Sequence, residues 1–211
     1  MTNKKAVAQK LLQINAIKLS PDNPFTWASG WKSPIYCDNR KSLSFPYIRE
    51  FIKSELCNEV FTSFPEAEMI AGVATAGIPW GAMVSDQLKL PFIYVRSKPK
   101  DHGLGNQIEG FYEEGKSVVL IEDLVSTGKS SLEAAEALRN AGLKVEGMVS
   151  IFTYGFGVAA DAFKASGIKL ISLTDYSSLI HLALEQQVIT EDDEKALLNW
   201  RENPAEWGKF V

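Results

Sequence analysis

The residues best suited to chemistry lie in one short segment, VVLIEDLVSTGKSS, which spans residues 118 to 131. Its apolar run predicts a buried strand, and two acids, Glu122 and Asp123, follow at the carboxyl end of that run. The next residues are small and rich in hydroxyl groups, and a helix is predicted to begin at about Ser130. The amide groups of a helix N-terminus bind phosphate, while carboxylates accept hydrogen bonds from sugar hydroxyls or lie close to Mg²⁺. The segment therefore predicts a site for a phosphorylated sugar.

Two other interpretations of this segment are weaker. Gly128, Lys129 and Ser130 match the end of a P-loop, but that motif requires a glycine five positions before Gly128, where this chain has Asp123. Alternatively, the turn serves only to cap a helix, as Ser and Thr often do. Capping explains one hydroxyl group and leaves the two adjacent acids unexplained.

A second segment, RSKPKDHGLGNQIEG at residues 96 to 110, combines cationic residues with one proline and three glycines. It has no apolar periodicity, and it is long for a connection inside a compact domain. Loops of this length are usually functional lids or linkers. The segment predicts a lid, with a solvated basic loop as the alternative.

The elements that must position these segments alternate between strands and helices. Apolar runs predict strands at residues 69–73, 92–95, 117–121, 145–152 and 168–173. Helical patterns predict helices at residues 46–62, 79–88, 130–140 and 158–166. This alternation is typical of an α/β fold with a doubly wound, mainly parallel sheet flanked by helices, which binds ligands at the carboxyl ends of its strands.

The chain before the first predicted sheet strand has a different character. Apolar positions at helical spacing predict an amphipathic helix over residues 4–17. Residues 21–44 are rich in Pro, Trp, Ser and Gly, and a short strand is predicted from Ile35 to Asp38. Near the other end of the chain, Trp200 and Trp207 are expected to pack the C-terminal segment against the rest of the molecule.

Composition excludes several functional classes. The 211 residues fit one α/β domain, and a net charge of −4 with a pI near 5.3 argues against a general nucleic-acid binder. Cys37, Cys57, His102 and His181 are too scattered for a zinc site. The amino-terminal stretch MTNKKAVAQKLLQIN lacks the apolar core of a signal peptide, and no apolar run reaches membrane-spanning length. We therefore expect a cytosolic protein that contacts neither nucleic acid nor membrane.

The sequence EDLVSTGKS after an apolar strand resembles the phosphoribosyl pyrophosphate (PRPP) motif of type I phosphoribosyltransferases. This resemblance implies that Glu122 and Asp123 contact the ribose hydroxyls and that the following turn holds the 5′-phosphate. It also implies that Mg²⁺ arrives with PRPP near these two acids, without a direct protein ligand. The residues of the turn that the resemblance assigns to PRPP are Leu124, Val125, Ser126, Thr127, Gly128, Lys129 and Ser130.

The predicted lid segment at residues 96–110 points to one family among the type I phosphoribosyltransferases. It is similar to the flexible catalytic loop of orotate phosphoribosyltransferases. In that family Arg, Lys and His gather around pyrophosphate, which implies catalytic and PRPP-binding roles for Arg96, Lys100 and His102. A cationic loop suits a polyanionic leaving group, and its closure would exclude water. Lys100 is expected to cause the largest loss of activity when it is replaced by Ala. The resemblance also implies a homodimer, because this loop reaches the neighbouring subunit's site.

Two further segments fit the same family. GVATAGIPWGA, from residue 72, resembles the loop at the pyrophosphate and implies contacts from Thr75 and Ala76. An ordinary strand-to-helix turn explains that segment equally well. TWASGWKSPIYCDNR, from residue 26, resembles the hood over the orotate base, which implies orotate contacts from Lys32 and Tyr36, together with Ser126 of the turn. Plain packing is the alternative for Tyr36.

The hood and the neighbouring strand also depart from the family pattern. Some members have a PRPP-contacting Lys where this chain has Ala28, and an Arg for the carboxylate of the base in the region of Tyr154.

The resemblance as a whole implies a single phosphoribosyltransferase domain over residues 1–211, with a hood formed mainly by residues 1–45. It implies Mg²⁺-dependent transfer of the 5-phosphoribosyl group from PRPP to orotate, which gives orotidine 5′-monophosphate and pyrophosphate for de novo UMP synthesis. Asp123 would be catalytic together with the loop cations. A purine phosphoribosyltransferase is disfavoured by the hood residues. A PRPP-sensing regulator that binds nucleic acid is disfavoured by the acidic pI and the cationic lid.

Overall fold

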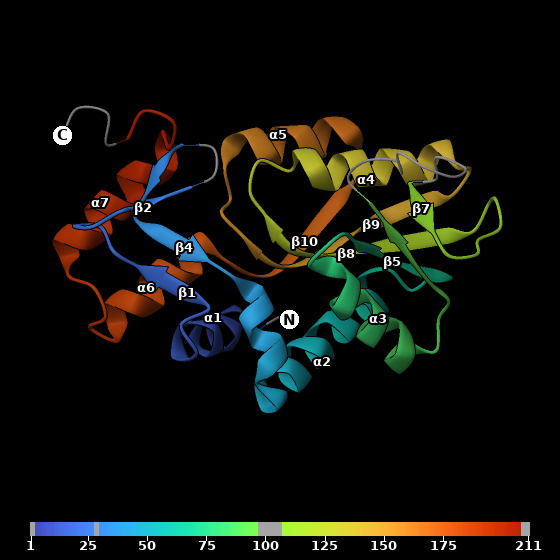
Figure 1. Ribbon diagram of the computed structural model, residues 1–211, viewed down its shortest axis with the longest axis horizontal. Helices are drawn as coiled ribbons and strands as arrows, with labels where there is room; N and C mark the ends of the chain where they lie inside the picture. The colour runs from blue at the N-terminus through green and yellow to red at the C-terminus, as the bar shows by residue number, and fades with distance from the viewer. Residues whose placement is uncertain (1–2, 28–29, 97–106, 208–211) are drawn as a thin grey trace.

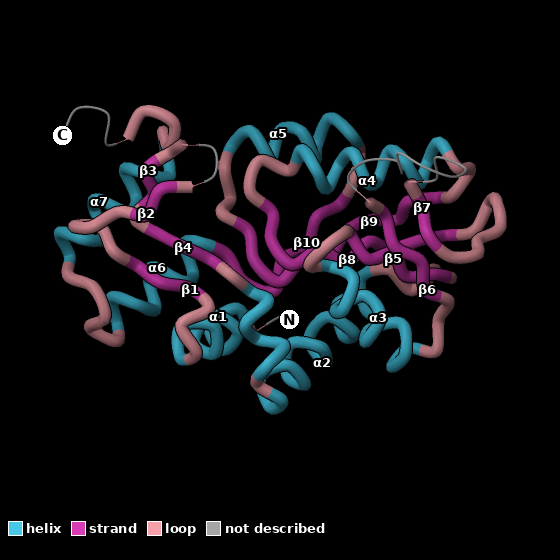
Figure 2. Tube along the Cα trace, in the orientation of Figure 1, coloured by secondary structure: helices cyan, strands magenta, loops and turns pink. Residues whose placement is uncertain are grey.

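The computed structural model describes residues 3–27, 30–96 and 107–207. Its centre is a six-stranded sheet in the order β10-β9-β8-β5-β6-β7, in which every pairing is parallel except that of β6 with β7 (Figures 1 and 2). The strands are β5 (Met69–Val73), β6 (Phe92–Val95), β7 (Ile108–Glu109), β8 (Ser117–Val125), β9 (Lys144–Thr153) and β10 (Lys169–Asp175). The predicted α/β class and the mainly parallel sheet are confirmed.

Helices cover both faces of the sheet, as a doubly wound fold requires. One face carries α4 (Lys129–Asn140) and α5 (Gly157–Ser166), and the other carries α2 (Pro46–Ser63) and α3 (Gly77–Leu88) (Figure 1). Side chains alternate along β8, so this strand contributes to the hydrophobic core on each face of the sheet. Val118 and Leu120 pack under α4 and α5, whereas the next residue in each case packs under α2 and α3. This two-sided burial explains why β8 reads as a continuous apolar run.

Strand β8 is longer than the apolar run predicts. It continues through both acids to Val125, so Glu122 and Asp123 lie inside the strand rather than after it. The reason is backbone pairing, because Leu124 and Val125 stay in register with Phe152 and Thr153 of the ten-residue strand β9. Strand β7 was not predicted at all. It lies in the last part of the predicted lid segment and pairs with Tyr94 and Val95 of β6.

The predicted helix over residues 4–17 is wrong in its last turn. Helix α1 (Lys4–Gln13) ends early, and Asn15 adopts a left-handed conformation with φ of 53°. The chain then enters strand β1 (Ile17–Leu19), in which Ile17 pairs with Cys37. An apolar residue at helical spacing thus proves to be a strand residue, because pairing with a distant segment overrides the local pattern.

The hood region contains two small antiparallel sheets. Strand β1 pairs with β4 (Ile35–Cys37), and β2 (Phe25–Thr26) pairs with β3 (Lys32–Ser33). A 3₁₀ helix, η1 (Asn39–Ser44), then leads into α2. The last helices, α6 (Tyr176–Glu185) and α7 (Glu191–Glu202), lie beside these strands at the left of Figure 1.

Trp200 of α7 anchors this arrangement, which confirms its predicted packing role. It is fully buried, and its Nε1 donates a hydrogen bond to the Lys32 carbonyl oxygen at 3.1 Å. Its ring lies within 6 Å of the rings of Trp27, Tyr154, Phe156 and Tyr176. Trp207 is partly buried against the same core. Within the three described ranges, no helix has the length and apolar character needed to cross a bilayer.

Candidate active site

The carboxyl ends of the parallel strands bring most of the predicted site residues to one edge of the sheet. Residues 74–76 follow β5, Arg96 follows β6, and the turn at 126–128 follows β8. Because the strands run the same way, segments far apart in the chain meet at this edge. The hood strand β4 and the start of η1 approach the same edge, since the Asn39 amide bonds to the main chain of Asp123.

A pocket of about 260 Å³ lies where these segments meet. One side, which we call the sheet wall, consists of Thr75, Ala76, Asp123 and Leu124. The opposite side, the hood wall, consists of Cys37, Asp38 and Arg40. Four residues predicted to contact PRPP therefore line one pocket. The hood wall was missed, although its residues fall in the KSPIYCDNR motif and two of them carry charge.

Glu122 and Asp123 occupy different depths. Glu122 is 5% exposed, and its two carboxylate oxygens accept hydrogen bonds from the Asp123 backbone N–H and the Ser131 hydroxyl, both at 3.0 Å. Burial raises the pKa of Glu122 well above its ordinary value, and the charge of Asp123 raises it further. Asp123 is only partly buried and faces the pocket. Burial raises its pKa as well, while Glu122 and Arg40 act in the opposite direction.

The hood wall carries a matched pair of charges. Arg40 Nε donates to Asp38 Oδ1 at 2.6 Å, and this hydrogen bond lowers the pKa of the Asp38 carboxyl group. Arg40 is exposed, so its guanidinium retains contact with solvent at the pocket. The pocket thus offers an ionised carboxylate and a cation on one side, opposite the acid of β8 on the other.

The turn after β8 has the form that phosphate binding needs. Gly128 has a φ of 80° and is the N-cap of α4, where no side chain caps the first turn. A Cβ at Gly128 would also lie 2.9 Å from Cε2 of Phe163, so a larger residue is excluded on two counts. Thr127, Lys129 and Ser130 are exposed around this helix start. The uncapped amide groups and the neighbouring hydroxyls form a surface that can bind an anion.

Small residues after β5 allow α3 to pack directly on the sheet. A Cβ at Gly77 would lie 2.4 Å from the Ile121 carbonyl oxygen, and one at Gly72 would lie 2.9 Å from the Gly77 carbonyl oxygen. The peptide bond between Ala74 and Thr75 is cis, and the Thr75 side chain is exposed. Close helix packing therefore explains the glycines, while the exposed threonine and its place in the pocket fit the predicted pyrophosphate contact.

Arg96 is the predicted loop cation that the structure describes. Its backbone N–H donates to the Gln107 carbonyl at 2.9 Å, and Gln107 Nε2 donates back to the Arg96 carbonyl at 2.9 Å. Its guanidinium lies 3.8 Å from Glu109 Oε1 of β7. These contacts hold the two ends of the predicted lid together at the edge of the sheet. Lys100 and His102 lie outside the described residues, as does most of the 96–110 segment.

The predicted base-binding residues lie in the hood and in the turn. Lys32 Nζ donates to Thr26 Oγ1 at 2.9 Å across the β2–β3 pair. Tyr36 is 41% exposed, and its ring centroid lies 5.7 Å from that of Phe25. Ser126 is partly buried at the end of β8. These contacts fit both interpretations of Tyr36, since one face of the ring packs while much of the side chain stays accessible.

Tyr154, at the position where some relatives have Arg, lies inside the aromatic cluster around Trp200. It is 2% exposed, and its ring stacks on Phe156 with centroids 5.4 Å apart. Burial raises the pKa of its phenol well above the ordinary value. The side chain therefore acts in packing. Ala28, the other departure, lies outside the described residues.

Among the described residues of the site, the pocket acids are the candidate ligands for a metal ion. Across the described ranges, no group of three or more His, Cys, Asp and Glu side chains is arranged to hold a metal ion. The carboxylates of Asp38 and Asp123 nevertheless supply hard oxygen donors, which suit Mg²⁺.

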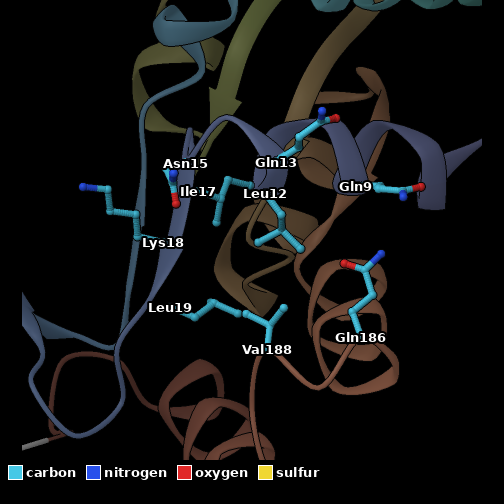
Figure 3. A pocket seen from close by; sticks show the side chains of 9 residues that line it. All are labelled: Gln9, Leu12, Gln13, Asn15, Ile17, Lys18, Leu19, Gln186 and Val188. Atoms are coloured by element: carbon cyan, nitrogen blue, oxygen red, sulfur yellow. The ribbon is translucent and has the colours of Figure 1, made fainter.

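A second and larger pocket lies in another part of the molecule. Its volume is about 660 Å³, and it is formed by α1, β1 and the connection after α6 (Figure 3). Its polar lining is mainly neutral, with the amides of Gln9, Gln13, Asn15 and Gln186. It contains no acid and shares no residue with the pocket at β8. The volume of a pocket therefore does not by itself identify the active site.

Comparison with known proteins agrees with the geometry. Residues 50–182 match the family model of the phosphoribosyl transferase domain. The chain is 56% identical over 206 residues to an orotate phosphoribosyltransferase from Phocaeicola vulgatus, covering 98% of this chain and 97% of that protein. It is 53% identical over 209 residues to one from Listeria monocytogenes, covering 99% and 100%.

A solved structure extends the agreement to the fold. The crystal structure of orotate phosphoribosyltransferase from Aeropyrum pernix superposes with a TM-score of 0.73 at 28% identity, covering 86% of this chain and 98% of that one. The sequence relatives and this structure thus agree over most of the chain, and the chain belongs to the orotate phosphoribosyltransferase family.

Proposed function

We propose that this protein transfers the 5-phosphoribosyl group from PRPP to orotate and so forms orotidine 5′-monophosphate and pyrophosphate in UMP synthesis. The observation that carries the proposal is the pocket itself, in which Asp123, Thr75 and Ala76 meet; the turn that follows Asp123 in the chain leads to the uncapped start of α4. The sequence identity with orotate phosphoribosyltransferases over nearly the whole chain supports this choice of substrates.

Each part of PRPP has a matching part of the site. The turn from Ser126 to Ser130 binds the 5′-phosphate and anchors the sugar, so that binding energy remote from the reaction positions C1′. Asp123 accepts hydrogen bonds from the ribose hydroxyls. The Glu122 carboxylate accepts a hydrogen bond from the Asp123 backbone N–H and so helps to hold Asp123 in position. Thr75 and Ala76 contact the pyrophosphate group.

In the chemical step, orotate N1 forms a bond to C1′ and releases its proton to solvent, as the C1′–O bond to pyrophosphate breaks, through a transition state with positive charge on the sugar. Negative charge develops on the departing pyrophosphate. Arg96 stabilises this charge from the end of β6, together with Lys100 and His102 of the loop, whose roles rest on the family resemblance. The carboxylate of Asp123 lies beside the sugar, where it favours the positive charge of the transition state.

The base is proposed to bind between the turn and the hood. Ser126 donates its hydroxyl hydrogen to orotate, Tyr36 covers one face of the ring, and Lys32 contributes positive charge. The exposed part of Tyr36 supports this role. Mg²⁺ is proposed to bind together with PRPP near Asp123 and Glu122, where it neutralises charge on the diphosphate.

We further propose a homodimer in which the 96–110 loop serves the neighbouring site, and a cytoplasmic location. The dimer rests on the family resemblance. The free thiols of Cys37 and Cys57 favour a reducing compartment.

The test is orotate consumption, followed by ultraviolet absorbance, with PRPP and Mg²⁺ present and with each omitted in turn. Loss of orotate that requires both supports the proposal. Binding of PRPP without loss of orotate would contradict it, and the same assay with purine bases and a gel-shift with RNA and DNA would then separate the two alternative functions.

A further inference from the structure

We propose that Asn39 is a positioning residue of the PRPP site, which fixes the main chain of Asp123 and holds the two walls of the pocket in register. This inference rests on the proposed function. Asn39 is the first residue of η1 and is only 1% exposed. Its Nδ2 donates a hydrogen bond to the Asp123 carbonyl oxygen at 2.7 Å, across 84 positions of sequence.

The Asp123 carbonyl needs this partner because it lies beyond the last residue of β8 that pairs with β5. Strand β5 pairs with β8 only as far as Ile121, and the register of β8 with β9 passes from Glu122 to Leu124 without a partner for Asp123. A backbone carbonyl left without a hydrogen bond in a buried place costs free energy. The Asn39 amide supplies the bond that a neighbouring strand supplies elsewhere in the sheet.

The orientation of the Asn39 amide is determined from its other end. Cys37 Sγ donates to Asn39 Oδ1 at 3.4 Å, which leaves the amide nitrogen to face Asp123. Burial raises the pKa of the Cys37 thiol well above its ordinary value, so the sulfur keeps the proton that it donates. The side chain therefore acts as a two-ended link, with its acceptor toward the hood and its donor toward β8.

This link joins the two walls at the residues that form the pocket. Asp38 and Arg40 of the hood wall immediately flank Asn39 in sequence, and Cys37 lies two positions before it. On the other side, the bonded carbonyl belongs to Asp123 itself. One hydrogen bond thus sets the distance between the hood wall and the carboxylate that we assign to the ribose. Asn39 does not line the pocket, so we expect it to act on the reaction through Asp123.

The test compares Asn39→Leu with Tyr176→Phe. Leu has a similar volume and cannot donate a hydrogen bond. Tyr176→Phe is the matched control, because it removes one buried hydrogen bond, from Tyr176 Oη to the Leu197 carbonyl at 2.9 Å, between α6 and α7 and outside the pocket. For each protein, the dissociation constant of PRPP by calorimetry, the KM for PRPP, kcat and the melting temperature are measured.

Asn39→Leu is expected to raise both the PRPP dissociation constant and the KM for PRPP about tenfold, with a smaller change in kcat at saturating PRPP. Tyr176→Phe should lower the melting temperature by at least as much and leave the KM for PRPP unchanged. Unchanged PRPP binding in Asn39→Leu overturns the proposal, and so does an equal loss of binding in both variants. If Asn39→Leu does not fold, Asn39→Ser is subjected to the same comparison.

The design separates this inference from the proposed function. If the wild-type protein binds PRPP but does not consume orotate, the proposed function fails, while the ratio of PRPP dissociation constants still decides the role of Asn39. If the wild-type protein consumes orotate and Asn39→Leu binds PRPP normally, only the role of Asn39 fails. A wild-type protein that binds no PRPP overturns both.

Discussion

The sheet wall and the hood wall face the same pocket but are built in different ways. The sheet wall stands on the mostly buried nine-residue strand β8 and on β5, and α3 packs so closely on β8 that Gly77 has no room for a Cβ. The hood wall stands on strands of two or three residues, and its order comes from side chains such as Asn39 and Trp200. Backbone pairing therefore determines the geometry of the sheet wall, whereas individual side-chain contacts determine the geometry of the hood wall.

The comparison predicts that the chemistry depends more on the sheet wall. Asp123→Asn removes the carboxylate assigned to the ribose and is expected to lower kcat/KM for PRPP roughly 100-fold, since substrate positioning contributes effects of this size. Asp38→Asn, on the hood wall, should lower it no more than about tenfold, because the Asp38 carboxylate is already paired with Arg40. Steady-state kinetics of both variants decide the matter, and equal losses would break the comparison.

Close packing of the sheet wall predicts a strong effect on stability. Gly77→Ala places a methyl group against the Ile121 carbonyl and is expected to lower the free energy of unfolding by about 1–3 kcal/mol. Gly157→Ala is the matched control, because a Cβ there meets no atom within 4 Å, and its effect should lie within about 0.5 kcal/mol or be slightly stabilising. Urea denaturation measures both changes. If Gly77→Ala left the free energy of unfolding unchanged, the packing of α3 on the sheet would be able to accommodate the added methyl group, contrary to this prediction.

Glu122, the buried acid next to Asp123, predicts a dependence of folding stability on pH. The pKa of Glu122 is raised in the folded state, so the native protein holds a proton that the unfolded chain releases above pH of about 4.3. Folding stability from this group is therefore present at low pH and is lost as pH rises through the folded pKa. Glu122→Gln should raise the melting temperature by roughly 2–6 °C at pH 8, because burying a charge costs on the order of 1–2 kcal/mol.

That gain should shrink as the pH is lowered toward 4.5, where the wild-type carboxyl group also becomes neutral. Thermal melts of both proteins across this range provide the measurement. A constant difference between them at every pH would show that Glu122 is ionised in the folded protein throughout.

The hood predicts a change in stability of about the same size as that expected at Glu122. Trp200→Phe removes the hydrogen bond to the Lys32 carbonyl while keeping an aromatic ring in the cluster, and it should lower the free energy of unfolding by about 1–2 kcal/mol. Limited proteolysis within residues 20–35 should become faster than in the wild type, since the β2–β3 pair loses one of its anchors. Equal cleavage rates would indicate that ring packing alone holds the hood.

The parts predicted correctly from the sequence are those that local patterns determine. The run Met69–Val73 forms β5 with the predicted bounds, since a strand buried on both faces needs continuous apolar residues. The start of α4 directly after a glycine turn was also predicted, because glycine at 128 and the helical pattern that follows it are local features. The two acids led to a predicted end of β8 that is too early, because pairing with β9 continues past them to Val125.

What could not be predicted depends on contacts between distant segments. Nothing local distinguishes Ile17 of β1 from a helix residue, and its partner Cys37 lies twenty positions away. Arg40 and Asp38 reach the pocket only because Asn39 and β4 bring the hood to the sheet edge. The packing of Trp200 was predicted, but its contact with the Lys32 carbonyl was not, because it joins opposite ends of the chain.

The bond from Trp200 to Lys32 has a consequence for synthesis on the ribosome. The hood strands emerge before the sheet, yet their partner in α7 emerges more than 160 residues after them. Ion pairs of α1 with Asp175 and Glu185 impose the same delay. The βαβ core can form while the chain is still being translated, whereas the hood contacts are completed only after α7 has been translated. A chain that terminates before α7 should therefore be released with a folded sheet and an incomplete active site.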